Sequence, residues 1–432
     1  MEHRSAMDLL SRWSDKEYWK QLCQNLSISD DNRSTASDGG YTEHKSQLTD
    51  KPLQHLLIYD GYALIDKQCD TNLGNKVSQA ISDLETHHSL PATFALLFDE
   101  TWLLAFQSQT FLLSNNILHT RMKFNFDMLA WHIDPTRNQV GFSPHRDRQP
   151  DTDEALEQSF YADGQAKYVT HWIALTDANP NNSCLYVIPK QFDPGYLQGD
   201  DGDDPSQESN NSYAISKDMK SDDKFSDPLS RALPNKQSYQ NIRALPRQPG
   251  QSIIFTHRIL HWGSAGNPHY KVGPRIAISF VYSDPEYEAP YLTNFAMTKD
   301  KILPPFALRL LLVCAQLLIY YQRFELSSVY LRACYDYVKL HEMELNEVYR
   351  KKVYVEFVKA MKEFRDEKVE DDTGNSLKDN DDGCEKDNTN GYSDDEDAML
   401  EAMLDNQEEF EDDFDDIEYE DVRDRKRAKV NV

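Results

Sequence analysis

The sequence lacks both an apolar run of membrane-spanning length and a cysteine framework. Its most apolar stretch, Phe306 to Tyr321, is interrupted by Arg309 and Gln316 and falls short of the ~20 residues that cross a bilayer. The six cysteines form no C-x-x-C pair, which argues against a zinc ribbon and a disulfide scaffold. The N-terminal residues alternate charged and aromatic side chains without an apolar signal segment. We therefore expect reduced thiols, no membrane span and an intracellular protein, cytoplasmic or nuclear.

Charge is distributed very unevenly along the chain. Residues 366–421 hold 26 Asp or Glu and three Lys, whereas the last eleven residues carry five Lys or Arg and one Asp. Of the net charge of -27, the first 365 residues account for only -8, which is typical of a globular protein. The composition predicts a disordered acidic tail over 366–432 with a basic end.

The two ends of this tail favour different interactions. A long acidic segment attracts cationic surfaces, so a basic protein partner is expected and direct nucleic-acid binding is not. The terminal run from Arg425 to Lys429 has the composition of a nuclear-import signal, although such short runs also arise by chance.

Apolar periodicity divides the rest of the chain into three parts. Residues 1–50 combine one or two short helices over Met7 to Leu26 with a polar linker. Residues 51–300 contain many short apolar runs separated by Gly and Pro turns. Helical spacing returns over 301–365, in the segments Phe306–Tyr321, Phe324–Leu340 and Asn346–Phe364. We expect the first of these helices to be buried.

The central part predicts a mainly β fold, namely a jelly roll (double-stranded β-helix) with flanking helices. Phe124 to Ile133 shows the clearest period of two, with Phe124, Phe126, Met128, Ala130 and His132 on one face. A helix is expected over Leu73–His87, and further strands over Leu53–Ile65, Ala92–Phe98, Trp102–Phe106, Tyr168–Leu175 and Cys184–Ile188. The polar stretch Phe192–Gln248 is either a mobile lid or a solvated insertion without function.

Two motifs in this part supply side chains that bind metals. The segment GFSPHRDR places His145 and Asp147 two residues apart, so that both project to the same side of an extended chain. Two imidazoles and one carboxylate on one face of an octahedral metal form the ligand set of non-haem Fe(II) oxygenases, with three positions left open. The second motif, IIFTHRILHWGSAGN, offers His257 or His261 as the third ligand.

A rival pair and several aromatic residues leave alternatives open. His132 and Asp134 also have the His-x-Asp spacing, although the proline after Asp134 favours a structural turn. His171 either reaches the pocket or is a hydrogen-bonded core residue. Three tryptophans flank the motifs and form either pocket walls or plain core: Trp131, Trp172 and Trp262.

Five separated segments between Leu129 and Tyr282 resemble the phytanoyl-CoA dioxygenase family of Fe(II)/2-oxoglutarate oxygenases, in the order of that family. They are AWHIDP, GFSPHRDR, HWIALTDANPNNSCLYVIP, HWGSAGN and PRIAISFVY. The resemblance implies that His145, Asp147 and His261 bind Fe(II). It favours His261 over His257 because a glycine and a serine follow His261 at positions 263 and 264.

The resemblance also implies a 2-oxoglutarate pocket around Arg275. A guanidinium binds a carboxylate through two parallel hydrogen bonds and keeps its charge, so Arg275 is expected to hold the distal carboxylate. Ser279 shares its strand face and Ser264 follows the third ligand, so both are candidates for the same pocket. Because halogenating relatives replace the carboxylate ligand by a small residue, the presence of Asp147 implies hydroxylation.

The expected activity is therefore hydroxylation of an organic substrate with Fe(II), 2-oxoglutarate and O₂, releasing succinate and CO₂. The substrate is a lipid, a small metabolite or a protein side chain. A coenzyme A thioester would need a basic groove, and the basic residues nearest the motifs are Arg146 and Arg148. The alternative is an interaction protein that keeps the oxygenase fold and binds a basic partner through its acidic tail.

Overall fold

The computed structural model describes residues 5–29, 52–66, 70–148, 153–198, 228–295, 303–324 and 326–375. The chain divides into two compact units, one of residues Lys16–Arg309 and one that combines Met1–Asp15 with Leu310–Val432. The linker after Ser29, the centre of the polar insertion and nearly all of the acidic tail lie outside the described residues. The expectations for these segments, and the predicted domain limits, therefore stay predictions.

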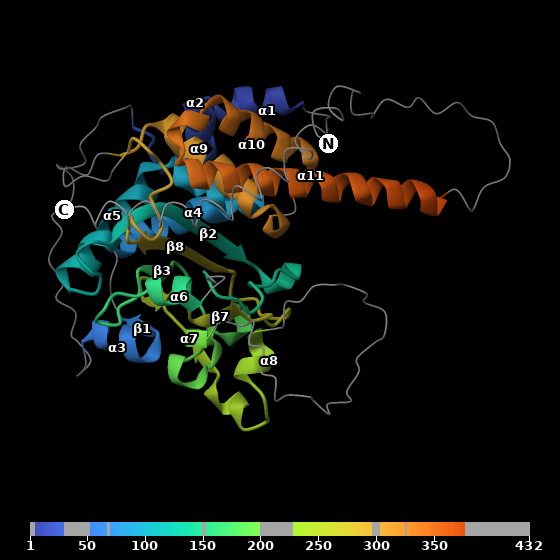
Figure 1. Ribbon diagram of the computed structural model, residues 1–432. Coiled ribbons are helices and arrows are strands. Elements are labelled where there is room, and N and C mark those ends of the chain that lie inside the picture. Colours follow the sequence, from blue (N-terminus) through green and yellow to red (C-terminus); the bar gives the residue numbers. More distant parts are fainter. Residues whose placement is uncertain are drawn as a thin grey trace, which may run out of the picture. The chain divides into compact units, whose positions relative to one another are not determined.

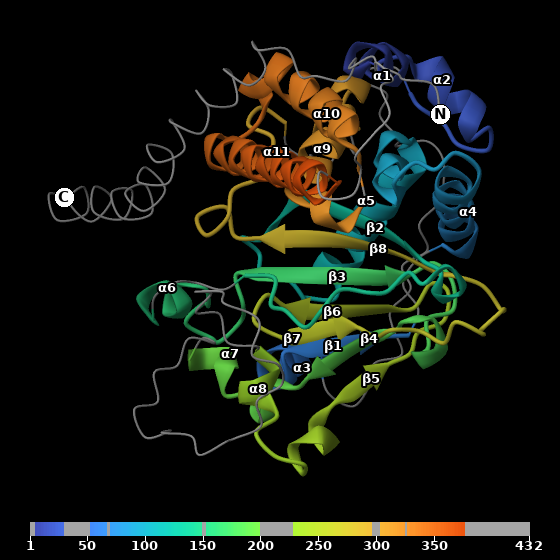
Figure 2. The same ribbon diagram turned by 90° about the vertical axis from the view of Figure 1, so that its right-hand side faces the viewer.

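The larger unit is built around two antiparallel sheets (Figures 1 and 2). The first has the strand order β1-β6-β3-β8-β2 and the second the order β5-β4-β7. In chain order the strands are β1 (Tyr62–Ile65), β2 (Lys123–Ile133), β3 (Tyr168–Ala174), β4 (Leu185–Ile188), β5 (Arg243–Leu245), β6 (Ser252–Thr256), β7 (Leu260–Gly263) and β8 (Arg275–Ser283). Trp172 and Phe255 of the first sheet join Leu185 and Leu245 of the second in one buried apolar cluster.

Antiparallel sheets with flanking helices agree with the predicted oxygenase core, but "mainly β" does not hold for the described part of the chain. Among the described residues, helices are longer and more numerous than strands. The helices of the larger unit are α2 (Lys16–Leu22), α3 (Leu53–Asp60), α4 (Thr71–His87), α5 (Asp99–Ser114), α6 (Asp153–Gln158), α7 (Gly195–Gln198) and α8 (Pro228–Ala232). Five short 3₁₀ helices accompany them: η1 (Ala92–Leu97), η2 (Pro135–Arg137), η3 (Pro180–Asn182), η4 (Lys190–Phe192) and η5 (Ser238–Asn241).

Before residue 110, two strand predictions were wrong and a third was only partly correct. Leu53–Ile65 forms α3 followed by the short strand β1, Ala92–Phe98 is almost entirely η1, and Trp102–Phe106 lies inside α5. All six residues of η1 are buried, and so are most of those in α5. A segment that is apolar on all sides has neither a helical nor a strand period, so its pattern cannot separate the two structures.

The strands that carry the motifs were predicted correctly, with one local difference in β2. β2, β3 and β4 occupy the predicted segments to within a residue or two. The pairing of β2 with β8 shifts register between Phe124 and Met128, and Phe126 has the left-handed φ of 71°. This bulge breaks the predicted alternation, and the period of two holds only from Met128 onward.

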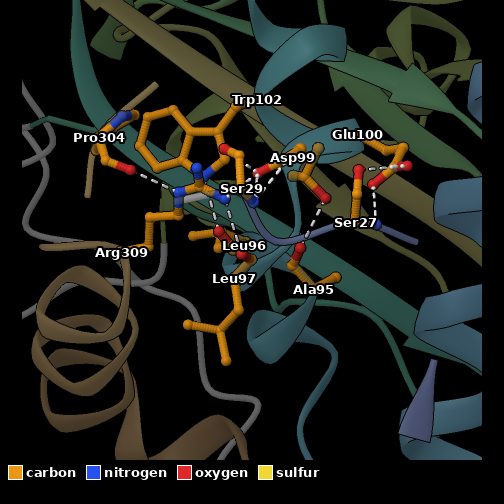
Figure 3. A network of polar contacts seen from close by, with 11 residues as sticks. Ser27, Ser29, Ala95, Leu96, Leu97, Asp99, Glu100, Trp102, Pro304 and Arg309 are labelled. Carbon is orange, nitrogen blue, oxygen red and sulfur yellow. Dashed lines mark hydrogen bonds and ion pairs between the residues drawn. The ribbon is translucent and has the colours of Figure 1, made fainter. Parts of the chain in front are cut away.

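A polar clasp joins three distant segments of the larger unit (Figure 3). Asp99, in the first turn of α5, accepts hydrogen bonds from the Ser29 amide at 2.9 Å and from Arg309 Nη1 at 2.6 Å. Arg309 also donates to the carbonyls of Pro304 and Leu97. Because Asp99 and Arg309 are both buried, each charge depends on the other for compensation.

The smaller unit is helical, as the sequence predicts. It contains α1 (Ala6–Trp13), most of α9 (Phe306–Ile319), η6 (Tyr321–Arg323), α10 (Ser328–Leu340), η7 (Glu342–Glu344) and α11 (Glu347–Asn375). Aromatic pairs connect these helices, since Tyr335 of α10 stacks on Phe357 of α11 with ring centroids 4.2 Å apart. Residues Leu310 to Leu318 of α9 are buried, as expected. Over the part of the chain that the structure describes, none of the helices has the length and apolarity needed to traverse a bilayer.

Candidate metal centre

The structure brings His145, Asp147 and His261 together. One ligand atom from each lies within 4.8 Å of the other two. His145 belongs to the loop that follows η2, and His261 belongs to β7. The two histidines form an antiparallel bridge in which each amide donates to the other's carbonyl at 3.1 Å. This bridge places their ring centroids 4.3 Å apart.

Hydrogen bonds to the main chain orient both imidazoles. His145 Nδ1 lies 2.7 Å from the Ser143 carbonyl, and His261 Nδ1 lies 3.0 Å from the Ile259 carbonyl. Because a carbonyl can only accept, each Nδ1 is the donor, and in the neutral ring this leaves the lone pair on Nε2. The two Nε2 atoms face Asp147 Oδ1, at 3.8 Å from His145 and 3.5 Å from His261. Metal-binding histidines are typically oriented by such bonds.

The Asp147 carboxylate is also held with one oxygen free for the centre. Its Oδ2 accepts a short hydrogen bond from the Thr170 hydroxyl of β3, whereas Oδ1 faces the two imidazoles. Exposed side-chain fractions of 32% for His145, 17% for Asp147 and 6% for His261 show that the centre opens on the His145 side. Two nitrogen donors and one carboxylate oxygen, with one open side, fit a divalent iron site of the facial-triad type.

The rival histidines occupy other environments. Asp134 caps η2 by accepting from the Thr136 amide at 2.9 Å, as expected of a structural turn. His132 is buried, and burial lowers its pKa. His257 is fully buried with Nδ1 bonded to the Tyr168 carbonyl at 3.2 Å, and burial lowers its pKa to about 3. Neither histidine belongs to the group of converging ligand atoms.

Arg275, at the start of β8, is a buried cation. It is 3% exposed, and burial lowers its pKa to about 10. Its Nε has no hydrogen-bond partner, and no ion pair to Arg275 occurs among the described residues. The guanidinium carbon lies 5.7 Å from the Trp172 ring centroid. Because an uncompensated buried charge is costly, this environment fits a residue that pairs with a bound anion.

The two predicted serines differ in position. Ser279 is buried and lies four residues after Arg275, on the same face of β8. Its hydroxyl donates weakly to the Leu129 carbonyl at 3.4 Å. Ser264 is half-buried and follows the last residue of β7. Their roles toward a cosubstrate stay predictions.

Trp172 and His171 are core residues, whereas Trp131 and Trp262 are half-buried. Trp172 belongs to the apolar cluster between the sheets. Trp131 is half-buried and meets Phe142 edge-on at 4.3 Å, while Trp262 stacks on Tyr186 at 5.8 Å. The nitrogens of His171 bond to Ser108 at 2.6 Å and Ser252 at 2.9 Å.

Sequence reasoning missed two side chains that touch the candidate ligands. Thr170 bonds to Asp147, and the half-buried Phe142 lies 5.3 Å from His145, ring to ring. The signal for Thr170 was its alternation with Trp172 along one strand face. Phe142 lies in an irregular loop, where no periodicity indicates its direction.

Comparison with known proteins adds a family and a set of loosely similar structures. Residues 75–268 match the family model "Phytanoyl-CoA dioxygenase (PhyH)". This match includes the three candidate ligands and Ser264 but ends before Arg275. No curated protein matches the chain.

Among solved structures, the epimerase SnoN from nogalamycin biosynthesis is 15% identical, with 54% of this chain and 82% of SnoN covered and a TM-score of 0.30. The carbocyclase SnoK of the same biosynthesis is 16% identical, with coverage of 57% and 87% and a TM-score of 0.33. EctD from S. alaskensis is 11% identical, with coverage of 65% and 89% and a TM-score of 0.32. Superpositions this loose identify neither a substrate nor equivalent residues. The family match and the converging His145, Asp147 and His261 together identify the part of the chain from residue 75 to 268 as belonging to the phytanoyl-CoA dioxygenase (PhyH) family of Fe(II)- and 2-oxoglutarate-dependent oxygenases.

Proposed function

We propose that this protein hydroxylates an organic substrate, converting a C–H bond to C–OH while 2-oxoglutarate and O₂ become succinate and CO₂. The convergence of the His145, Asp147 and His261 ligand atoms carries this proposal. Bound Fe(II) would supply the activation of O₂ at this centre. With three protein ligands in place, three positions remain for cosubstrate and O₂.

The protein's own residues would bind and orient the reactants. Arg275 would supply a buried positive charge for the distal carboxylate of 2-oxoglutarate, and Ser264 and Ser279 are the hydroxyls that we expect to contribute to the same pocket. The 5.3 Å contact of Phe142 with His145 places an aromatic ring at the more exposed edge of the centre. This ring would shield the centre from water. A small-molecule substrate is typical of the family, and a lipid or a protein side chain is the other substrate class that the sequence leaves open. Binding of a basic partner through the acidic tail is a separate prediction from sequence.

Metal content of the purified protein tests the ligand set. The wild-type chain should bind one Fe(II), and His145→Ala and His261→Ala should each abolish stoichiometric binding. His257→Asn and His132→Asn are matched controls, since each removes an imidazole of a rival position and should leave one iron per chain. Unchanged iron in both ligand variants, or loss of iron in the His257 variant alone, would show that the ligand set is wrong.

A further inference from the structure

The metal-binding candidate Asp147 lies between two arginines, and the side chain of the first is fully buried. Arg146 Nη1 donates to Asp193 Oδ2 at 2.7 Å and Nη2 donates to Asp193 Oδ1 at 3.0 Å. Both side chains of this pair are 0% exposed. A bidentate pair fixes the plane of the guanidinium as well as its position. Asp193 follows η4, 47 residues further along the chain.

The second arginine makes an equivalent pair with a different segment. Arg148 Nε donates to Glu288 Oε2 at 2.6 Å and Nη2 donates to Oε1 at 2.5 Å. Its remaining Nη1 donates to the carbonyl of Asp147 itself at 2.7 Å. Burial opposes the charge of Arg148, but Glu288 and neighbouring tyrosines raise its pKa well above the usual value. Glu288 lies in the loop after β8.

Arg258 links these two ion pairs to the segment that carries His261. Its carbonyl accepts from Arg146 Nη1 at 2.5 Å, and its own Nη1 donates to the Arg148 carbonyl at 3.1 Å. Arg258 precedes His261 by three residues. The two segments that carry the ligands are therefore bonded to each other beyond the bridge of the histidines.

These contacts exclude one role for the arginines and suggest another. Both guanidinium groups already bind a carboxylate through two hydrogen bonds. Neither therefore offers a free pair of N–H donors to a phosphate group of a substrate. The ligand loop itself has no regular secondary structure around Asp147. Its main chain can hold a carboxylate in one orientation only if bonds from other segments fix it.

We propose that Asp193 and Glu288 are positioning residues of the metal centre, which hold Arg146 and Arg148 and thereby orient the Asp147 carboxylate. This inference rests on the metal site of the proposed function. Residues that orient metal ligands typically change metal affinity by 10- to 100-fold when they are replaced. The two carboxylates should therefore affect the centre although neither touches the metal.

Co(II) binding tests this inference without relying on turnover. Asp193→Asn and Glu288→Gln keep the side-chain shape and remove the charge. Each should weaken Co(II) affinity by at least about tenfold and alter the visible d–d spectrum, which reports ligand geometry. Near-ultraviolet circular dichroism of the metal-free variants should remain native. The Glu288 pair is about one-fifth exposed, so the Glu288 variant should fold even if the buried Asp193 variant does not.

A neighbouring carboxylate provides the matched control. Glu286 pairs with Arg121 at 2.5 Å, but this carboxylate is 71% exposed. Glu286→Gln should leave Co(II) affinity within about twofold of wild type, as expected for a surface pair. Wild-type affinity and spectrum in a folded Glu288→Gln would overturn the proposed positioning role. If His145→Ala bound Co(II) as tightly as wild type, the metal site itself would instead be overturned.

Discussion

Gly141 and Gly263 pack backbone against backbone where the two ligand-bearing segments meet. A Cβ atom at Gly141 would lie 2.6 Å from the Cα of Gly263 and 2.8 Å from Ser183 Oγ. The amide of Gly263 donates to the Phe142 carbonyl at 3.0 Å. This close approach continues into the bridge between His145 and His261. The absence of two side chains therefore sets the separation of the two imidazoles.

Gly141→Ala is expected to damage the centre as well as the fold. The added methyl group meets main-chain atoms, which cannot rotate away, so overpacking should cost about 1–3 kcal/mol of unfolding free energy. Because the strain falls between the ligand segments, Co(II) affinity should fall as well. Urea unfolding and Co(II) titration measure the two effects.

Gly164→Ala is the control for Gly141→Ala, because it should destabilise the fold without adding a methyl group between the two ligand segments. Gly164 has a left-handed φ of 85°, but a Cβ there has as its nearest neighbour Ile58 Cγ2, at 3.5 Å. Alanine at this position should cost about 1–2 kcal/mol of stability and leave Co(II) affinity unchanged. Equal losses of affinity in both variants would mean that Gly141 acts only through global stability.

Arg275→Met should weaken cosubstrate binding and leave the metal-free protein at least as stable. Removing one member of a charge pair should cost about 2–5 kcal/mol of 2-oxoglutarate affinity. Without 2-oxoglutarate, the variant loses a buried charge that no described residue compensates, so its unfolding free energy should be unchanged or higher. The iron content should stay at one per chain.

Thermal unfolding with and without 2-oxoglutarate tests this prediction, because a ligand that binds only the folded state raises Tm. Wild-type protein loaded with metal should show the rise, and Arg275→Met should lose most of it. Arg121→Met, at a half-exposed surface position, should keep the rise. A normal rise in Arg275→Met would mean that another cation holds the carboxylate.

His171 should make stability depend on pH. Burial lowers the pKa of His171 to about 3, against about 6.5 for an unfolded chain. Between these values the unfolded state binds a proton that the folded state does not, so stability falls as pH decreases below about 6.5. The slope for this residue rises from about 0.7 kcal/mol per pH unit at pH 6.5 toward a limit of about 1.4 at lower pH. His171→Gln should flatten the urea-unfolding profile between about pH 6.5 and 5.5, whereas the exposed-site variant His88→Gln should not. An unchanged slope in His171→Gln would contradict the assignment.

Sequence motifs indicated the centre better than they indicated its surroundings. His145 and Asp147 are separated by one residue, so local geometry predicted that they project to the same side, whereas His261 was preferred to His257 through the resemblance to a family. The partners of Arg146 and Arg148 lie 47 and 140 residues away in the chain. One sequence offers no signal that pairs such distant residues among many carboxylates, and the arginines were therefore described only as a basic cluster.

The errors in secondary structure have a related cause. Ala92–Phe98 and Trp102–Phe106 are apolar because they are buried on several sides within one unit. Their burial hides the period that separates helix from strand. Around Phe126, a single residue with left-handed φ shifts the register of β2. Because bulky residues rarely adopt that conformation, the sequence did not predict it.

Each imidazole of the centre is oriented by a carbonyl two residues earlier in its own segment. This part of the site is consequently modular: a segment of only three residues contains both the nitrogen donor and the group that sets its tautomer. Substitutions in the loops around the open side, or the exchange of an entire loop during evolution, can alter what the protein accepts without disturbing these donors. The Asp147 carboxylate lacks that independence, because it is held by the Thr170 hydroxyl of another strand and stands on a main chain whose neighbouring arginines bond to distant segments. Divergence among related chains should therefore be limited first by what surrounds Asp147.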